Sequence, residues 1–453
     1  MATTYLTRTS WGTATNRQKF TQSFWIKRSA IGVQQALLGV ESGGNDEARV
    51  LFRTDDTFEF YDYQSGYTFR YITNRKFRDC SAWYNIVLRV DTDNGTVANR
   101  VRIYINGVQE TSFSTATQPS RNLNTFYNSS GNHIVQIGRQ STGNSYFNGS
   151  MSHVNFLDGE DRDGSFFGST DATTGEWEIK TTPSGVNYGT NGYFILKDGN
   201  TITDSSANSN NFSLGAGTLT NTKDCPSNVL ATFNSLIKAT TTFSNGNTTG
   251  QTQNSSNYLA GMSTLGMPKN TGIYYCEIKL ISESSSGESC IGVASEEAFT
   301  LRDAGTLSVA EAPYNWGLRN QGREYYNGSS ADNKHGGFAA GNIMGVYFDS
   351  TNNKLTFSKN GGWWNGTSSW SGNSPDLSNY FVGTSSGNYQ TFFFNCGDAG
   401  NTANAKWSAN FGNGYFGTTA VSSAGTNTSG QVGIFEYNMP SNSKVLSTKG
   451  LNT

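Results

Sequence analysis

Three tryptophans lie close together in a stretch of Gly, Asn, Ser and Thr that follows a hairpin-like segment. They are Trp363, Trp364 and Trp370. The flat faces of indole rings stack on sugar rings, and neighbouring amide and hydroxyl groups bond to sugar hydroxyls. The spacing therefore predicts a glycan-binding surface, with Tyr325 and Tyr326 as a weaker second candidate. The alternative is that one or two of these tryptophans cap a protein core or pack against another subunit.

A second group of residues suggests a metal. Asp158, Asp161 and Asp163 lie in one short acidic stretch, and Ca²⁺ prefers six to eight oxygen ligands from carboxylates and carbonyls. The stretch is therefore a candidate calcium site, and we expect no other cofactor. An arginine inside the stretch and the missing closing Glu of an EF-hand favour the alternative, a solvated acidic turn. Asp91 and Asp93 form a weaker calcium candidate.

Catalytic patterns have little support in the sequence. Glycoside hydrolases need paired carboxylates at a fixed separation. Glu176 and Glu178 would share one face of a strand, but they lie in a Gly/Thr-rich segment where a solvated loop is the simpler interpretation. His133, His153 and His335 lie far apart in the sequence, with no nucleophile motif nearby. We therefore expect a protein that is not an enzyme.

Composition limits the possible partners. The 453 residues include 32 Lys plus Arg and 34 Asp plus Glu, a formal net charge of -2, so there is no basic footprint for nucleic acid. No apolar run reaches the ~18 residues of a membrane helix, and the N-terminus lacks the regions of a signal peptide. The five cysteines include no CxxC pair, which favours thiols and synthesis in a reducing cytosol. Large rings on a low-charge surface favour contacts between subunits, so we expect a homo-oligomer.

Alternation of apolar and polar residues is the dominant pattern along the chain. Residues 85–90 and 101–105 alternate with a period of two, and the Asn-Gly dipeptide at 106–107 is a strong hairpin signal. The same layout recurs at 345–349 and 354–359, again followed by Asn-Gly. Many short strands between Gly/Asn turns indicate an all-β protein, and the repeated layout suggests two sandwiches of related topology.

Several of these segments resemble known domain families. Four segments together resemble a laminin-G-like, concanavalin-type jelly roll: residues 23–28, 81–87, 101–107 and 149–159. Five later segments together resemble a SPRY domain: residues 272–278, 316–319, 326–328, 341–361 and 409–412. One position departs from that family, because Cys276 stands where SPRY strands usually carry Trp. The resemblance implies two concanavalin-like jelly-roll sandwiches, at 1–197 and 225–418. An ordered connector at 198–224 would join them, and a C-terminal extension would occupy 419–453. It also implies that calcium could bind at a sheet rim of the first domain.

The amino-acid sequences of three further segments resemble those of structural proteins from cyanophage-like marine tailed phages. These are residues 167–171, 188–192 and 225–234. The resemblance implies a virion structural protein, made in the host cytoplasm and exposed on a tail fibre or as decoration on the capsid. It would contact other virion proteins, host-surface glycans, or both. Two alternatives stay open, a non-viral SPRY-type module that binds a protein partner and, less favoured, a polysaccharide hydrolase.

Overall fold

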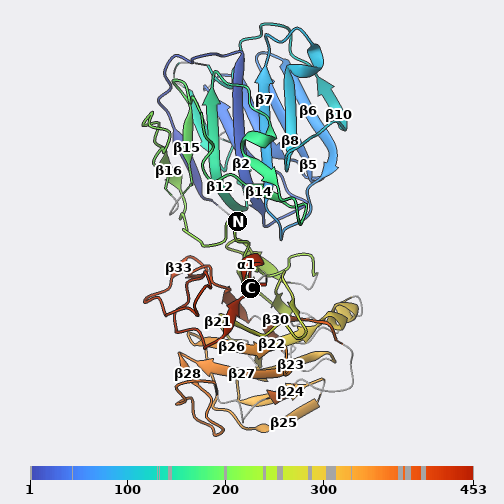
Figure 1. Ribbon diagram of the computed structural model, residues 1–453, viewed down its shortest axis with the longest axis vertical. Helices are drawn as coiled ribbons and strands as arrows, with labels where there is room; N and C mark the ends of the chain where they lie inside the picture. The colour runs from blue at the N-terminus through green and yellow to red at the C-terminus, as the bar shows by residue number, and fades with distance from the viewer. Residues whose placement is uncertain are drawn as a thin grey trace. The chain divides into compact units, whose positions relative to one another are not determined.

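The computed structural model describes residues 3–451, apart from residues 43, 130, 132, 141–144, 198–200, 238–240, 253–258, 284–287, 303–312, 328, 376–380, 383–388 and 399–404. The chain divides into two compact units, Met1–Asn221 and Thr222–Thr453. Figure 1 colours the first unit from blue to green and the second from green-yellow to red. Both are built almost entirely of strands, which confirms the predicted all-β fold.

The first unit contains two large sheets and one small one. The larger sheet has eight strands, in the spatial order β10 (Phe113–Thr117), β6 (Tyr67–Lys76), β5 (Thr57–Tyr63), β4 (Glu47–Phe52), β3 (Gln35–Glu41), β11 (Ile134–Ile137), β1 (Tyr5–Arg8) and β16 (Ser213–Ala216). The second sheet has six, in the order β15 (Tyr193–Ile195), β12 (Gly149–Asp158), β2 (Lys19–Arg28), β7 (Tyr84–Asp91), β8 (Val101–Ile105) and β9 (Val108–Gln109). A hairpin of β13 (Gly168–Thr170) and β14 (Trp177–Ile179) and two short 3-10 helices, η1 (Val97–Asn99) and η2 (Gly164–Phe166), complete the unit.

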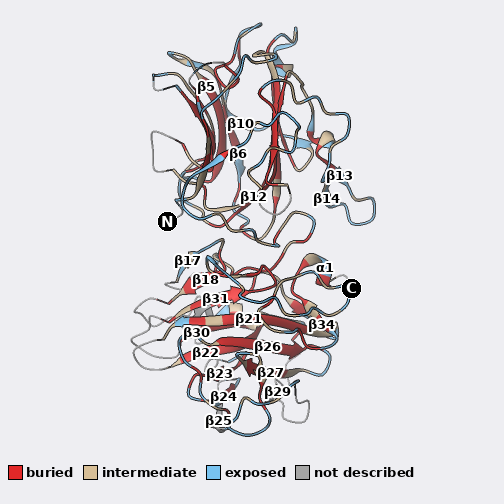
Figure 2. Cartoon of the chain, turned by 90° about the vertical axis from the view of Figure 1, so that its left-hand side faces the viewer, coloured by how far each residue is buried: buried red, intermediate tan, exposed pale blue. Residues whose placement is uncertain are grey.

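The two large sheets enclose one hydrophobic core, seen edge-on as facing buried strands in Figure 2. Ile86, Leu88 and Val90 of β7 are fully buried in it, as the alternation predicted. Val87 points to the opposite face and packs with Phe167, beneath residues that follow the sandwich. The six-stranded sheet is therefore covered on both faces at this point.

The predicted hairpin turns are confirmed by their backbone angles. Asn106 and Gly107 have φ values of 49° and 75° between β8 and β9, and Asn360 and Gly361 have φ values of 50° and 83°. Two consecutive residues with positive φ are the signature of the tight turn that matches the twist of paired strands, and Asn and Gly tolerate it best.

The second unit repeats the two-sheet plan. Its larger sheet has nine strands: β17 (Thr242–Ser244), β18 (Thr249–Gln251), β31 (Lys406–Asn410), β21 (Ile273–Ser282), β26 (Ile343–Asp349), β27 (Lys354–Lys359) and β28 (Gly362–Trp363) in order, with β29 (Phe381–Val382) on β27 and β34 (Ser443–Val445) on β21. The facing sheet has β19 (Leu259–Met262), β30 (Thr391–Asp398), β22 (Ser289–Ser295), β23 (Asn315–Arg319), β24 (Arg323–Tyr326) and β25 (Ser329–Asn333), with β20 (Met267–Pro268) on β30. The remaining elements are β32 (Tyr415–Phe416), β33 (Thr419–Ala420), η3 (Glu296–Arg302) and α1 (Thr448–Leu451).

The core of the second unit also shows the period-two alternation of a strand. Tyr274, Cys276, Ile278 and Leu280 of β21 are fully buried between the sheets. Tyr275 points away from this core into a second cluster, which includes Trp363. The outer face of the nine-stranded sheet is thus apolar where the C-terminal residues cover it.

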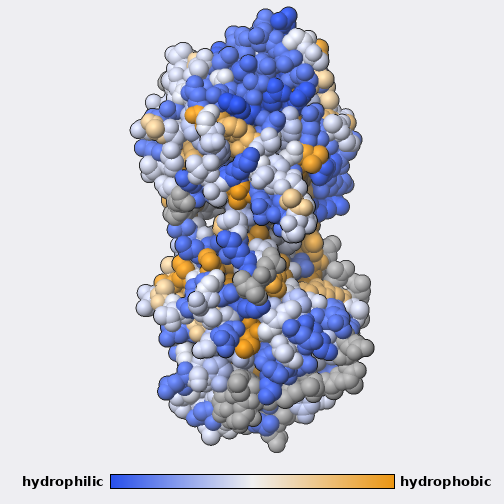
Figure 3. Space-filling view, in the orientation of Figure 1, coloured by the Kyte–Doolittle hydropathy of each residue, from blue (hydrophilic) through white to orange (hydrophobic). Residues whose placement is uncertain are grey.

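Two segments outside the predicted sandwiches are integrated into the units. β16 lies in the stretch expected as a connector and pairs with β1. β34 lies in the C-terminal extension and pairs in parallel with β21. None of the helices in the described ranges has the length and hydrophobicity needed to cross a lipid bilayer. Hydrophilic and intermediate residues predominate on the face drawn in Figure 3.

Candidate functional site

Asp158, the first residue of the candidate calcium site, is a buried structural carboxylate at the end of β12. Its Oδ2 accepts hydrogen bonds from the backbone N–H groups of Thr15 (2.7 Å) and Asn191 (3.0 Å). Its Oδ1 accepts from the backbone of Asn16 (3.1 Å) and from the side-chain amide of Asn128 (2.7 Å). The carboxylate therefore ties three separate loops to β12, and four protein donors occupy its oxygens.

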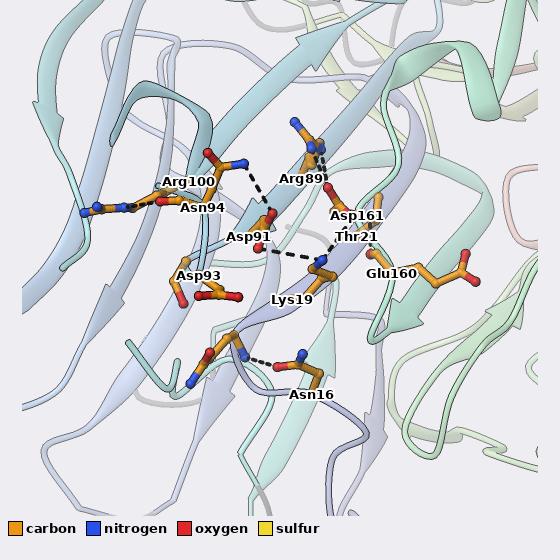
Figure 4. Close-up of polar contacts among 12 residues, drawn as sticks. Asn16, Lys19, Thr21, Arg89, Asp91, Asp93, Asn94, Arg100, Glu160 and Asp161 are labelled. Carbon is orange, nitrogen blue, oxygen red and sulfur yellow. Dashed lines mark hydrogen bonds and ion pairs between the residues drawn. The ribbon is translucent and has the colours of Figure 1, made fainter. Parts of the chain in front are cut away.

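Asp161 belongs to an ion-pair network at the rim of the six-stranded sheet (Figure 4). The Lys19 ammonium lies 3.9 Å from Asp91 Oδ1 and 3.7 Å from Asp161 Oδ1, so that it sits between two carboxylates. Arg89 Nε donates to Asp161 Oδ2 at 3.1 Å. Lys19 and Arg89 together supply the positive charge at this rim. Asp93 lies apart, with Arg121 at 3.7 Å, and both side chains are exposed.

Asp163 has a local role in the backbone. Its Oδ1 accepts from the Ser165 N–H at 3.0 Å and caps η2. The three aspartates thus have separate sets of protein partners. Within the described ranges, no group of three or more His, Cys, Asp and Glu side chains has a geometry that could hold a metal ion. The calcium site at Asp158, Asp161 and Asp163 stays a prediction without geometric support.

The pair of carboxylates considered for catalysis lies on the β13–β14 hairpin. Glu176 and Glu178 are exposed, and Trp177 between them packs inward, with its Nε1 donating to Asn85 Oδ1 at 3.2 Å. A Cβ added at Gly107 would lie 2.3 Å from the Trp177 ring. The hairpin therefore lies directly on the turn between β8 and β9, and Trp177 anchors it there.

Two of the three tryptophans predicted to bind glycans stack on a buried histidine. The ring of His335 lies 4.0 Å from Trp364 and 5.7 Å from Trp370, centroid to centroid, at interplanar angles near 30°. His335 Nε2 and Glu324 Oε1 are 2.6 Å apart in a buried pair. Trp370 Nε1 donates to the Gly336 carbonyl at 3.0 Å. Trp363 and Trp364 are both 5% exposed, which matches the core-capping alternative for these two residues, although Trp363 also lines a cavity.

Tyr325 and Tyr326 occupy β24, in the sheet opposite the tryptophans. As neighbours on a strand they point to opposite faces. Tyr325 is buried beside Arg319, whose guanidinium carbon lies 5.0 Å from the ring centroid, whereas Tyr326 is 42% exposed. The structure therefore does not place these tyrosines with Trp363.

Trp363 lines a cavity of about 460 Å³ on the outer face of the nine-stranded sheet, within the ~300–1,000 Å³ range of small-molecule sites. Its floor is aromatic. The Trp363 ring lies 6.2 Å from both Tyr275 and Tyr347, centroid to centroid. All three side chains are almost fully buried.

The rim of this cavity is polar and uncharged. Exposed amide and hydroxyl groups come from two loops, and they are those of Asn373, Ser374, Asn438, Ser441 and Asn442. Among the described residues that line the cavity, there is no Asp, Glu, Lys, Arg or His. An aromatic floor beneath a ring of neutral hydrogen-bonding groups suits a neutral, hydroxyl-rich ligand.

The far wall of the cavity is the stretch 437–442, held against the sheet by Glu277. This carboxylate accepts from the backbone N–H groups of Glu436 and Tyr437, each at 2.8 Å. Burial raises the pKa of Glu277 to about 7, with the nearby Glu436 adding to the rise. No sequence pattern pointed to this arrangement, because Glu277 and Tyr437 are distant in the chain and the SPRY-like segment 272–278, which contains Glu277, carries no mark of its partner.

Two family comparisons agree with this architecture. Residues 2–160 match the laminin-G type of the concanavalin A-like lectin/glucanases superfamily, and residues 273–397 match the SPRY domain family. The chain therefore combines a laminin-G-like domain with a SPRY domain. The two jelly-roll sandwiches predicted from the sequence are confirmed. We call Met1–Asn221 the laminin-G-like unit and Thr222–Thr453 the SPRY unit. The two domain matches support a role in binding or adhesion.

Comparisons with whole proteins give only distant similarities. No curated protein sequence matches the chain. The SPRY domain of human HERC1 is 12% identical, over 39% of this chain and 96% of that one, with a TM-score of 0.29. A putative carbohydrate binding protein from Bacteroides ovatus is 18% identical, over 50% and 59%, with a TM-score of 0.32. Mouse laminin alpha1 domains LG4-5 are 8% identical, over 89% and 78%, with a TM-score of 0.27. These similarities carry no argument about function.

Proposed function

We propose that this chain is a non-enzymatic adhesion protein of a phage particle that binds uncharged glycans of the host envelope. The cavity at Trp363 carries the glycan part of this proposal. Its floor is lined by the nearly buried rings of Trp363, Tyr275 and Tyr347, and its rim offers amides and hydroxyls. Sugar rings present C–H faces to aromatic rings and hydroxyls to neutral donors and acceptors, so the two surfaces are complementary.

The uncharged lining should affect whether the cavity binds neutral or anionic glycans. A buried carboxylate, Glu277, lies behind Tyr275 and accepts a hydrogen bond from its hydroxyl at 3.1 Å. The described lining residues carry no cation and Glu277 lies behind the floor, so these residues provide no positive charge to pair with a uronic or sialic acid. We therefore expect neutral sugars to be preferred over anionic ones.

The virion location rests on the resemblance of residues 167–171, 188–192 and 225–234 to phage structural proteins. On a tail fibre or capsid surface, the protein would be present in many copies and would contact other virion proteins. Single sugar contacts are weak, but linked copies raise avidity by ~10²–10⁴ without any new contact. A homo-oligomer on the particle would therefore attach firmly through a shallow neutral site.

The glycan proposal is tested with the purified full chain on immobilised oligosaccharides. Neutral chains of glucose, galactose and N-acetylglucosamine are compared with sialylated and uronic-acid chains. Ser374→Trp places a bulky group at the exposed rim without touching the core, and we expect it to reduce neutral-glycan binding at least tenfold. Trp363→Ala should do the same if it folds. Tyr326→Ala, an exposed tyrosine outside the cavity, is the matched control and should bind like the wild type.

Three results would contradict the proposal. Binding of a neutral glycan that Ser374→Trp leaves unchanged would exclude the cavity. Release of reducing sugar from envelope polysaccharide would favour the hydrolase alternative. Capture of one short peptide motif, without any glycan binding, would favour a protein-binding SPRY module. Labelled-antibody imaging of purified phage particles tests the location, and particles without label would exclude it.

A further inference from the structure

We propose that Glu277 is the positioning residue of this cavity, fixing residues 435–442 as its outer wall, so that the site exists only while this segment is docked. We call residues 435–442 the wall segment. The nature of the ligand rests on the proposed function, whereas the docking of the wall segment does not.

Glu277 lies on the outer side of β21, in a place where a strand normally presents a solvated side chain. Its neighbours Cys276 and Ile278 point into the sandwich core, so Glu277 points away from it. Even so, Glu277 is fully buried, because the wall segment covers it. A carboxylate buried at such a position requires compensating hydrogen bonds.

Both oxygens of Glu277 receive donors from the wall segment. Oε2 accepts from the Glu436 N–H, and Oε1 from the Tyr437 N–H, each at 2.8 Å. The side-chain amide of Asn410, on neighbouring β31, donates to Oε2 at 3.4 Å and to the Ile434 carbonyl at 2.9 Å. The Glu277 carboxylate and the Asn410 amide thus bind the backbone of residues 434–437, where the lining of the cavity begins.

The wall segment is anchored to β21 at both ends, and its outer side is bonded to residues 425–428, as in the Met439 N–H bond to the Thr426 carbonyl at 2.9 Å. Phe435, at its start, packs on Tyr275 with ring centroids 5.2 Å apart. Beyond its end, β34 pairs in parallel with β21, in the register Ile273 to Ser443. Tyr437–Asn442 lies between these anchors and faces Trp363 across the cavity. If the Glu277 contacts were broken, the wall segment would keep its tether through β34, the packing of Phe435 and Met439, and its hydrogen bonds to residues 422–428. Only its attachment to the face of β21 beside the cavity would be lost.

The charges around Glu277 give the wall segment a pH dependence. The groups that face it are Tyr275 of its own strand, Asn410 of β31, and Glu436 and Tyr437 of the wall segment. Burial raises the pKa values of both tyrosines, so they stay neutral below pH 9. The Glu277 pKa of about 7 lies above the ordinary value of 4.5. The docked state therefore binds this proton more tightly than a solvated carboxyl does, and docking weakens as the pH rises through 7.

Hydrogen exchange of the full chain, without any ligand, tests the docking. In the Glu277→Gln variant, an amide NH₂ replaces one acceptor and faces a backbone donor. We expect peptides that cover residues 434–442 to exchange at least tenfold faster, with β26 and β27 unchanged. Glu288→Gln, a half-exposed residue that pairs with Arg319 on the facing sheet, is the matched control. Unchanged protection of the wall segment in Glu277→Gln would overturn the proposal.

The wild type provides a second measurement that does not depend on a variant folding. After correction for the intrinsic pH dependence of exchange, protection of residues 434–442 should fall between pH 6 and pH 8, and protection of β26 should not. A flat profile for the wall segment would contradict the role of Glu277.

Glycan binding then separates this inference from the proposed function. Neutral oligosaccharides of glucose, galactose and N-acetylglucosamine serve as probes for the wild type and Glu277→Gln. A released wall segment with tenfold weaker binding supports both proposals. A released segment with undiminished binding overturns the positioning role and leaves the glycan function intact. If the segment is released but none of these probes binds the wild type, the proposed function fails and the positioning of the wall segment stands.

Discussion

Replacing Asp158 by Asn tests whether the acidic stretch at 158–163 is structural. Each oxygen of the Asp158 carboxylate accepts two N–H groups, at distances between 2.7 and 3.1 Å. In Asp158→Asn, whichever way the amide is turned, an NH₂ group faces two donors. Two hydrogen bonds to a charged acceptor are then lost, each worth about 1.5–3 kcal/mol. The expected loss of stability is about 3–6 kcal/mol, a large part of the ~5–15 kcal/mol of a typical domain.

The matched control is Asp161→Asn, which alters a partly exposed ion pair with Arg89 and Lys19. Such pairs contribute about 1 kcal/mol or less. The assay is urea unfolding of the full chain, with the transition of the laminin-G-like unit assigned by hydrogen exchange of β2 and β12, because two units need not unfold in one step. The same experiment in EDTA and in CaCl₂ should give equal midpoints. A loss below 1 kcal/mol for Asp158→Asn would refute the structural role, and a midpoint that rises in CaCl₂ would support the calcium site.

Three further predictions follow from local geometry. Gly168→Ala should loosen the β13–β14 hairpin, because its Cβ would lie 2.5 Å from the Trp177 indole, and limited proteolysis should then cut within residues 168–179. Gly66→Ala, whose Cβ meets no atom within 4 Å, should leave that pattern unchanged. Iodoacetamide should label Cys225 first in the native protein, because it is half-buried and the other four cysteines are buried. If mass spectrometry finds the first adduct on one of the other four cysteines, the predicted order of cysteine exposure is wrong. The rise in the Glu277 pKa from 4.5 to about 7 corresponds to about 3 kcal/mol of SPRY-unit stability, which is present below pH 4.5 and lost as the pH rises through 7. This loss should be absent in Glu277→Gln when urea midpoints are measured from pH 4.5 to 8.

The parts of the fold that could be predicted from the sequence are those fixed by local geometry. The Asn-Gly turns at 106–107 and 360–361 need positive φ at both residues, and Asn and Gly are the residues that tolerate this conformation best. The alternation in β7 follows from the two-residue period of a strand, so its core positions could be predicted without knowing the partner strands.

The candidate site could be predicted only in part. The aromatic-rich loop indicated a binding surface, but neighbouring residues on a strand point to opposite faces, and this separates Trp363 from Trp364. Trp363 reaches the cavity, whereas Trp364 stacks on the buried His335. The wall of the cavity comes from residues 437–442, and its anchor, Glu277, lies far away in sequence. Contacts at such separations follow from the return path of the chain, which no local pattern encodes.

Asp158 shows the same limit in the laminin-G-like unit. Its cluster of neighbouring carboxylates suggested a calcium site. The donors that occupy its oxygens come from residues 15, 16, 128 and 191, and none of them is near it in the sequence. A backbone N–H leaves no mark on residue type, so three of these four partners could not have been found from the sequence.

Glycan binding at the Trp363 cavity is tested most directly by a density map of the full chain incubated with the neutral oligosaccharide that binds best in the immobilised-glycan assay. We expect density for an intact sugar against Trp363, enclosed by Tyr437–Asn442, with its glycosidic bonds unbroken. Sugar density at another place, such as beside Trp370 or Tyr326, or density for a cleaved product, would contradict it.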